Sequence, residues 1–348
     1  MGSLIDWDLA ARAAKRFSPP PPGVTRTEAD EAVGELYQAT ARAAGHVAEL
    51  TGLDEPQVTA VTRVIDRPGW IDANSSGMRA VLTPLVDKLA ADNPVGRVAE
   101  GIGGRLTGVQ VGLVLGFLSG KVLGQFEFFD RPGGQLLLVA PNIVAVERQL
   151  KVSPADFRLW VCLHEVTHRV QFTAVPWLRR HMQNEVDALT AATDTDPDAL
   201  KRRLSGAVGE LVKVVRGQGN GEGLMAVVAT PEQRAVLDRI TAFMSLVEGH
   251  AEYVMNAVPA SVIPSQEAIE KRFAARRRKG GNALDRMLRR LLGLDAKTRQ
   301  YVDGAAFVRT VIDRVGLDGF NAIWTSTQTL PTKDEIAEPL SWIKRVHA

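Results

Sequence analysis

The sequence contains almost no cysteine. Cys162 is the single cysteine in 348 residues, so no disulfide can form within the chain. Secreted proteins commonly rely on disulfides, and their exclusion here favours a reducing compartment such as the cytosol. Cys162 lies inside an apolar stretch, which predicts a small core residue and not a nucleophile.

The chain also lacks a charge excess and a long hydrophobic run. Its formal net charge is +2, which gives no case for nucleic acid or an anionic membrane as a partner. The best membrane candidate, residues 106–120, is shorter than the ~20 apolar residues that a spanning helix needs. The first residues include Asp6 and Asp8 and lack the apolar core of a signal peptide. We therefore expect a cytoplasmic protein without stable membrane insertion.

One five-residue motif stands out against this ordinary composition. His164, Glu165 and His168 follow the order H-E-x-x-H. On an α-helix, positions four apart lie on the same face, so two imidazole rings can bind one metal ion there. The intervening glutamate is then placed to take a proton from an activated water, as in zinc hydrolases of the metallopeptidase type. The alternative is a pair of core histidines with an ordinary glutamate between them.

The residues around the motif predict a helix over residues 153–172. Ser153 is a suitable N-cap, Pro154 suits the first helical position, and Asp156 would complete a capping box. Apolar residues occupy both sides and few charges interrupt them, so we expect the helix to be buried through most of its length. Pro176 then ends it.

A catalytic zinc ion usually takes three protein ligands, so the third must come from elsewhere in the chain. We predict Glu248, with Glu252 one helical turn later to hydrogen-bond the free ring nitrogen of a ligand histidine. His250 is a rival, but it lies about 200° around the helix from Glu248, so the two side chains point in different directions. Glu185 and Asp187 are further rivals, although no carboxylate follows them one turn later. Glu248 and Glu252 could also form only ion pairs.

Glycine recurs at every fourth position from Gly104 to Gly124. Each glycine costs up to ~1 kcal/mol in a helix interior, so six in register indicate a purpose. We predict a buried helix whose stripe without side chains lets another backbone approach closely. The alternatives are a dimer face within a membrane and a phosphate loop, and the sequence lacks the G-x-x-x-x-G-K-[ST] pattern of such a loop.

The rest of the pattern is mostly helical, with one exception. In residues 125–140, two apolar runs flank a turn at 131–134, which predicts a hairpin with a strand at 136–139. That strand could pair with an extended substrate or only help to build the core. Helices are predicted over residues 4–17, 27–50, 74–92, 178–192, 198–216 and 231–256, and short helices from residue 282; the helix at 74–92 could be broken at Pro84. Between them we predict an extended proline spacer at 19–22, turns at 67–69 and 193–197, and a glycine-rich loop at 218–223.

The motif at 164–168, together with Glu248-Gly249-His250-Ala251-Glu252-Tyr253, resembles the thermolysin-like zinc peptidases called gluzincins. In that group a glutamate on a second helix completes the site, and the gap to it is shorter than the gap between His168 and Glu248 here. The wider chain looks like a largely uncharacterised bacterial family of zinc-dependent metalloproteases or hydrolases, some members of which are associated with biosynthesis of a deazaflavin coenzyme. The matching stretches are 112–125, 139–147, 156–172 and 245–255.

We therefore predict a mainly α protein with a small β-sheet (α+β) and a zincin-like metallopeptidase architecture. The expected organisation is one compact unit made of an N-terminal helical region (1–100), a catalytic core (101–260) and a C-terminal helical region (261–348). Its length is sufficient for one large domain or two smaller ones.

The predicted activity is hydrolysis of an amide bond in a peptide or protein substrate, with one Zn²⁺ per chain held by the two motif histidines and Glu248. Glu165 would take the proton of water and pass it to the leaving nitrogen. The developing oxyanion needs a further donor, for which Tyr253, Tyr301 and His181 are open candidates. The alternative is a non-catalytic zinc-binding or scaffold protein linked to cofactor metabolism.

Overall fold

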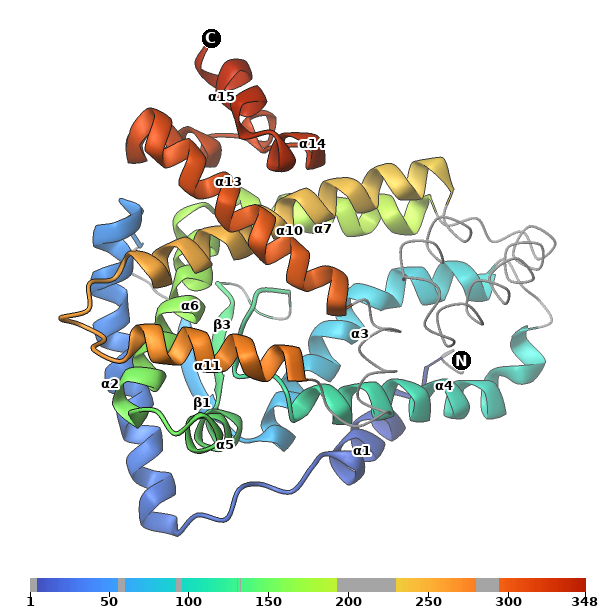
Figure 1. Ribbon diagram of the computed structural model, residues 1–348. Helices are drawn as coiled ribbons and strands as arrows, with labels where there is room; N and C mark the ends of the chain where they lie inside the picture. Colours follow the sequence, from blue (N-terminus) through green and yellow to red (C-terminus); the bar gives the residue numbers. More distant parts are fainter. Residues whose placement is uncertain are drawn as a thin grey trace. The chain divides into compact units, whose positions relative to one another are not determined.

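The computed structural model describes residues 5–55, 60–91, 96–129, 131, 133–192, 230–279 and 294–348. Helices make up most of these residues and the strands form one small sheet, which confirms the predicted mainly α class (Figure 1). Among the described helices, none combines the length and the apolar composition that crossing a membrane requires. The predicted helix at 198–216, the turn at 193–197 and the loop at 218–223 lie outside the described residues.

The chain divides into two compact units, which are described separately. The first comprises Met1–Arg179 and Val258–Glu270, and the second comprises Arg180–Ala257 and Lys271–Ala348. The three regions expected from the sequence, with boundaries at 100 and 260, stay a prediction.

The first unit contains the sheet and most of the helices of the N-terminal half. Its elements are α1 (Trp7–Phe17), α2 (Arg26–Thr51), β1 (Val61–Ile65), α3 (Arg67–Ala91), α4 (Gly96–Ser119), β2 (Gly124–Glu127), β3 (Gln135–Val139), α5 (Ala140–Leu150) and α6 (Pro154–Ala174). α7 (Trp177–Ala191) begins at its end, and α11 (Gln266–Lys279) begins in its second segment.

The central strand of the sheet is β3, with β1 parallel on one side and β2 antiparallel on the other. The predicted hairpin is confirmed, with Gly124 opposite Leu138 and two glycines at positive φ in the turn. β3 is fully buried from Leu136 to Val139, as expected for a strand that is covered on both faces. The sequence pattern did not predict β1, which pairs Val61 with Gln135.

The glycine stripe brings two helices into backbone contact. A Cβ atom added at Gly112 would lie 2.6 Å from a carbonyl oxygen of α1, and one at Gly116 would lie 2.8 Å from another. One added at Gly108 would lie 2.6 Å from the carbonyl oxygen of Asp6, the N-cap of α1. The close approach predicted for this helix is therefore confirmed. The expected helix was too long, however, because α4 ends at Ser119 and Gly124 belongs to β2.

The predicted turn at Arg67-Pro68-Gly69 is wrong, because these residues form the first turn of α3. Asp66 acts as the cap: its side chain accepts a hydrogen bond from Gly69 N at 2.8 Å. Proline is tolerated in a first turn, since its missing N–H has no partner there anyway. α3 also continues past Pro84 to Ala91, so the break considered at this proline is absent.

The proline spacer is held by a buried arginine of α3. Arg67 donates to Pro19 O at 2.9 Å and to Asn142 Oδ1 at 2.7 Å, and burial lowers its pKa. Asn142 in turn donates to the carbonyls of Ser119 and Val122, near the C-terminus of α4. The cation therefore lies among carbonyl oxygens whose partial negative charge stabilises it.

The second unit is helical in its described residues. It contains most of α7, then α10 (Pro231–Ala257), the end of α11, α13 (Leu294–Asn321), the short 3₁₀ helices η1 (Ala322–Trp324) and η2 (Thr327–Thr329), α14 (Lys333–Ala337) and α15 (Pro339–His347). Short helices were expected in this tail, but α13 runs for 28 residues and is kinked at Gly316, where φ is 76°. Trp324 and Trp342 are buried packing residues.

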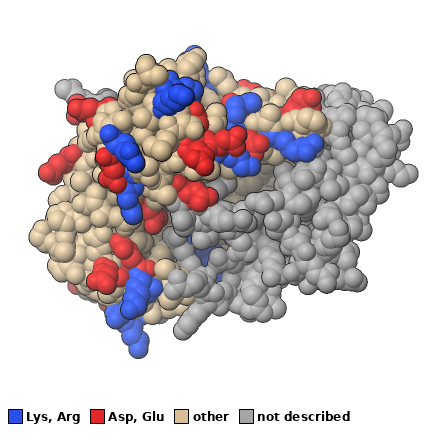
Figure 2. All heavy atoms as spheres, turned by 45° about the horizontal axis from the view of Figure 1, so that its top comes forward, with Lys and Arg blue, Asp and Glu red and all other residues tan. Residues whose placement is uncertain are grey.

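Charges of both signs lie close together on the face shown in Figure 2, and neither sign forms a continuous patch on its described part. Lys333 and Asp238 form an exposed pair of opposite charges, and their charged atoms are 2.8 Å apart. Exposed pairs of this kind contribute only about 0–1 kcal/mol to the free energy of unfolding. They balance charge locally and add little stability.

The contact between α1 and α4 generates a test with an internal control. Gly112→Ala should destabilise the protein by about 1–3 kcal/mol, because the new Cβ would lie 2.6 Å from Ala10 O and 2.7 Å from Ala13 Cβ. Gly45→Ala, in α2 with nothing within 4 Å of the new Cβ, should stabilise it by up to ~1 kcal/mol. Urea unfolding measures both changes, and equal effects of the two substitutions would contradict this account of the stripe.

Candidate metal centre

The helix that carries the H-E-x-x-H motif begins as its sequence predicts. Ser153 Oγ accepts a hydrogen bond from Asp156 N at 3.3 Å, and Pro154 occupies the first helical position. The expected capping box is wrong in its second half. The Asp156 carboxylate accepts instead from Ser265 N at 3.0 Å and from Ser265 Oγ at 2.6 Å. The two donors of Ser265 therefore replace the single backbone N–H that a capping box would offer to Asp156.

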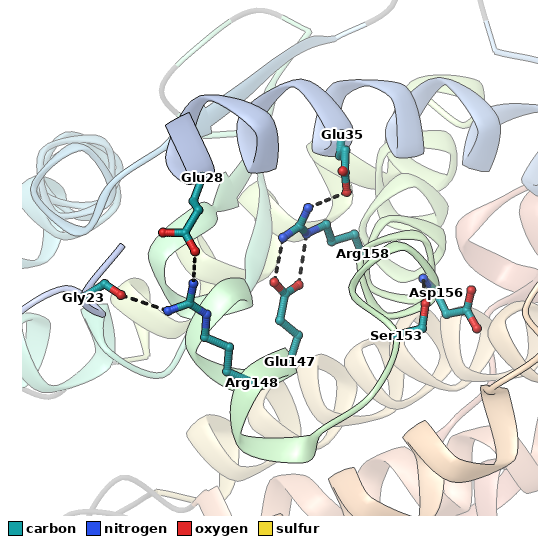
Figure 3. A network of polar contacts seen from close by, with 8 residues as sticks. All are labelled: Gly23, Glu28, Glu35, Glu147, Arg148, Ser153, Asp156 and Arg158. Carbon is teal, nitrogen blue, oxygen red and sulfur yellow. Dashed lines mark hydrogen bonds and ion pairs between the residues drawn. The ribbon is translucent and has the colours of Figure 1, made fainter. Parts of the chain in front are cut away.

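Buried ion pairs attach α6 to the segments around it. Arg158 lies between Glu147 of α5, which accepts two hydrogen bonds at 3.0 and 2.6 Å, and Glu35 of α2 (Figure 3). Burial alone would lower the pKa of Arg158, but the bonds and charges of these two carboxylates outweigh it and raise the pKa. Further along, Arg169 binds both carboxylate oxygens of Glu55 at 2.7 and 3.0 Å. α6 is thereby fixed near both of its ends.

The two histidines of the motif turn their ring nitrogens toward each other. His164 Nε2 and His168 Nε2 are 3.1 Å apart, and the ring planes are at 85°. Two nitrogen ligands of one tetrahedral zinc ion, each about 2.0–2.1 Å from the metal, would be about 3.3 Å apart. The observed separation therefore fits two ligands of a single ion.

The opposite nitrogen of His168 faces an amide. His168 Nδ1 lies 2.9 Å from Gln171 Oε1, and Gln171 is fully buried. An amide oxygen only accepts hydrogen bonds, so Nδ1 carries the proton and Nε2 keeps its lone pair. This is the tautomer that a metal ligand needs. Gln171 was not predicted from the sequence, although a polar residue one turn after His168 in an apolar helix was a usable signal.

Glu165, the glutamate of the motif, packs against Gly124, the first residue of β2. Glu165 is only 6% exposed, and a Cβ atom added at Gly124 would lie 2.6 Å from its Cγ and Cδ atoms. β2 is held from its other side by Gln125, which accepts from Trp70 Nε1 at 2.9 Å and donates to Asn74 Oδ1 at 3.0 Å. Gly124 therefore has a role outside the helix stripe: it makes room for the Glu165 carboxylate.

The cysteine of α6 has no part in this chemistry. Cys162 is fully buried, and burial raises the pKa of its thiol to about 12, although a hydrogen bond from Thr40 at 3.6 Å acts in the opposite direction. At neutral pH it is a protonated thiol in the core, as the sequence predicted.

In the second unit, α10 places Glu248 and His250 in different surroundings. Glu248 is 7% exposed, whereas the fully buried ring of His250 packs 5.2 Å from Phe320 and 5.3 Å from Trp324. Between them, Gly249 touches the backbone of α13, where a Cβ atom would lie 2.1 Å from Gly304 C. This contact fixes how α10 is rotated, and it favours Glu248 over His250 as the residue available to a metal.

The other rivals differ in their charge partners. Glu185 of α7 forms an ion pair with Arg239 of α10, with Nε 3.0 Å from both carboxylate oxygens, so its charge is already balanced. Asp187 is exposed on the same helix. Burial lowers the pKa of His181, which packs against Phe243. His181 and the half-buried Tyr253 stay candidates for the oxyanion donor, and the side chain of the third candidate, Tyr301, is outside those described.

His164, His168 and Glu248 form a group that could hold a metal ion. Two imidazole nitrogens and one carboxylate oxygen are a ligand set of catalytic zinc sites, in which the fourth position stays open. The residues of this chain therefore fit a zinc ion in chemistry, burial and histidine tautomer.

Comparisons with known proteins agree with this chemistry. A family model described as zincin-like metallopeptidase matches residues 5–343. A crystal structure described as a proposed hydrolase with a novel fold, from Chloroflexus aurantiacus, is 33% identical, covers 99% of each chain and has a TM-score of 0.71. No curated protein matches the chain.

The contact between Gly124 and Glu165 can be measured with a double-mutant cycle. Gly124→Ala should destabilise the protein by about 1–3 kcal/mol, because the new Cβ overlaps the Glu165 side chain. In a Glu165→Ala background the same substitution should cost clearly less, since the overlapping atoms are gone. Urea unfolding of the four proteins gives the coupling, and additive costs would show that Gly124 does not make room for Glu165.

Proposed function

The chain belongs to the family of zincin-like metallopeptidases, and from this premise we propose that it is a zinc-dependent peptidase with one metal ion per chain. In this proposal His164, His168 and Glu248 hold the ion and leave one position for water. The observation that carries it is the pair of histidine Nε2 atoms 3.1 Å apart, one of them in the ligand tautomer. A bound zinc ion would supply Lewis acidity, which activates water and polarises the substrate carbonyl.

Glu165 is the proposed general base. It follows His164 directly in the helix, and its carboxylate is buried beside Gly124. A base held in one position by packing can accept the proton of the attacking water and deliver it to the leaving nitrogen. A site that only binds metal has no need of a carboxylate here, which favours an enzyme over a scaffold.

β2 is the element proposed to bind the substrate backbone. Within the described residues, β2 is an edge strand of the sheet that pairs with β3, and the proposal places an extended substrate segment along its outer side. A peptide added there would run past Gly124 and therefore past the carboxylate of Glu165. This arrangement supports a peptide or protein as the substrate. The cytoplasmic location and the link to a deazaflavin coenzyme stay predictions.

The role of Glu165 is tested by Glu165→Gln, which keeps the shape of the side chain and removes the base. Turnover should fall roughly 10²- to 10⁴-fold while zinc content stays at one per chain. Elemental analysis and cleavage of a peptide library measure the two quantities. Glu335→Gln, which alters a carboxylate bonded to Arg345, serves as the control and should leave turnover unchanged. Wild-type turnover in Glu165→Gln would refute the general base, and zinc without hydrolysis in the natural protein would support the non-catalytic alternative.

The third ligand is tested by removing each rival carboxylate or imidazole. Glu248→Ala should weaken zinc binding by at least the roughly 10- to 100-fold that loss of an outer partner costs. Glu185→Ala, Asp187→Ala and His250→Ala should keep stoichiometric zinc, since they are assigned no place at the metal. Competition with a chromophoric chelator gives the dissociation constants. Unchanged zinc affinity in Glu248→Ala would reject this residue as the ligand.

A further inference from the structure

Gln171 is a buried polar residue that the proposed chemistry does not yet use. Its side chain is fully buried in α6, and its Oε1 atom lies 2.9 Å from His168 Nδ1. We propose that Gln171 is a positioning residue of the metal centre, which acts on the metal through His168. This inference rests on the proposed zinc site and adds the residue that prepares one of its ligands.

Gln171 determines which nitrogen of His168 carries the proton. A neutral imidazole carries one proton, on either Nδ1 or Nε2, and only the nitrogen without it can bind a metal. With the amide oxygen facing Nδ1, the proton is stabilised there and the lone pair is left on Nε2. Without an acceptor, both tautomers are populated, and a fraction of the protein presents a protonated nitrogen to the metal.

The same hydrogen bond orients the ring of His168. His168 and Gln171 are three positions apart on one helix, so their side chains meet on the same face and their separation depends on a rigid backbone. The hydrogen bond fixes the rotation of the ring and directs Nε2 toward His164 Nε2, 3.1 Å away. A flipped ring would turn the carbon edge of His168 toward the metal position.

The amide of Gln171 carries no charge. A carboxylate in this position would both orient the histidine and make it a stronger electron donor. An amide orients it without adding a second buried negative charge to α6, which already buries Glu165. We therefore expect Gln171→Glu to restore whatever Gln171→Leu loses in metal affinity, because both Gln and Glu offer an acceptor oxygen to Nδ1–H.

The matched control is Thr167→Val. Thr167 is also fully buried in α6, and its hydroxyl donates to Leu163 O at 2.7 Å within the helix. This substitution removes a buried hydrogen bond of the same helix without touching an acceptor of a motif histidine. It reports what a loss of polar contacts in α6 does by itself.

The experiment measures the zinc dissociation constant of the full chain and three variants by competition with a chromophoric chelator. Gln171→Leu should bind zinc roughly 10- to 100-fold more weakly, and Gln171→Glu at least as tightly as the natural protein. Thr167→Val should keep the natural affinity even if its melting temperature falls. A folded Gln171→Leu protein with natural zinc affinity would overturn the proposal, as would an equal loss of affinity in Thr167→Val.

A second readout does not depend on the metal. In the metal-free protein at a pH where the imidazoles are neutral, ¹⁵N NMR of the histidine rings should place the His168 proton on Nδ1, and Gln171→Leu should shift it toward a mixture. A proton on Nε2 in the natural protein would overturn the role of Gln171 even if the enzyme is active. Absence of zinc binding by the natural protein would instead overturn the proposed function and leave this readout intact.

Discussion

Two ring nitrogens that face each other across 3.1 Å are the constraint on which the rest of this structure depends. Lone pairs at this separation repel unless a cation, either a proton or a metal ion, lies between them. Because both rings belong to one α-helix, the backbone itself sets their spacing before any distant contact is made. The surrounding protein then has to keep that helix in place and its other polar groups satisfied.

The polar and charged groups that hold α6 in place are costly to bury. It buries charged and polar side chains in a mostly apolar helix, and burial of a charge is expensive unless a partner compensates it. Arg158 and Arg169 each have a carboxylate from another part of the chain, Glu147 and Glu55 respectively. These ion pairs fix the position of α6 more than they raise the free energy of unfolding, because the cost of desolvating the charges offsets most of their attraction. A site whose ligands must hold their geometry depends on such a rigid support.

Glycine solves the same spatial problem in three places. In α4 it lets the backbone of α1 approach, in β2 Gly124 leaves room for Glu165, and in α10 Gly249 meets Gly304 of α13. In each case the absence of a Cβ atom is what matters, since a Cβ added at that position would overlap a neighbour. The first contact builds the core of a unit, whereas the second places the proposed base.

The sequence by itself determined whatever depends on near neighbours: the helix around the motif, its Ser153 cap, the hairpin and the close-packed glycine helix. Periodicity, capping and turn chemistry act over a few residues, so they can be read along the chain. The tertiary structure decided which distant groups meet. In the folded chain the Asp156 carboxylate accepts a hydrogen bond from Ser265, and Gly124 lies against the glutamate of the motif. The partner of a polar side chain depends on where a remote segment lies, and local pattern does not encode that position.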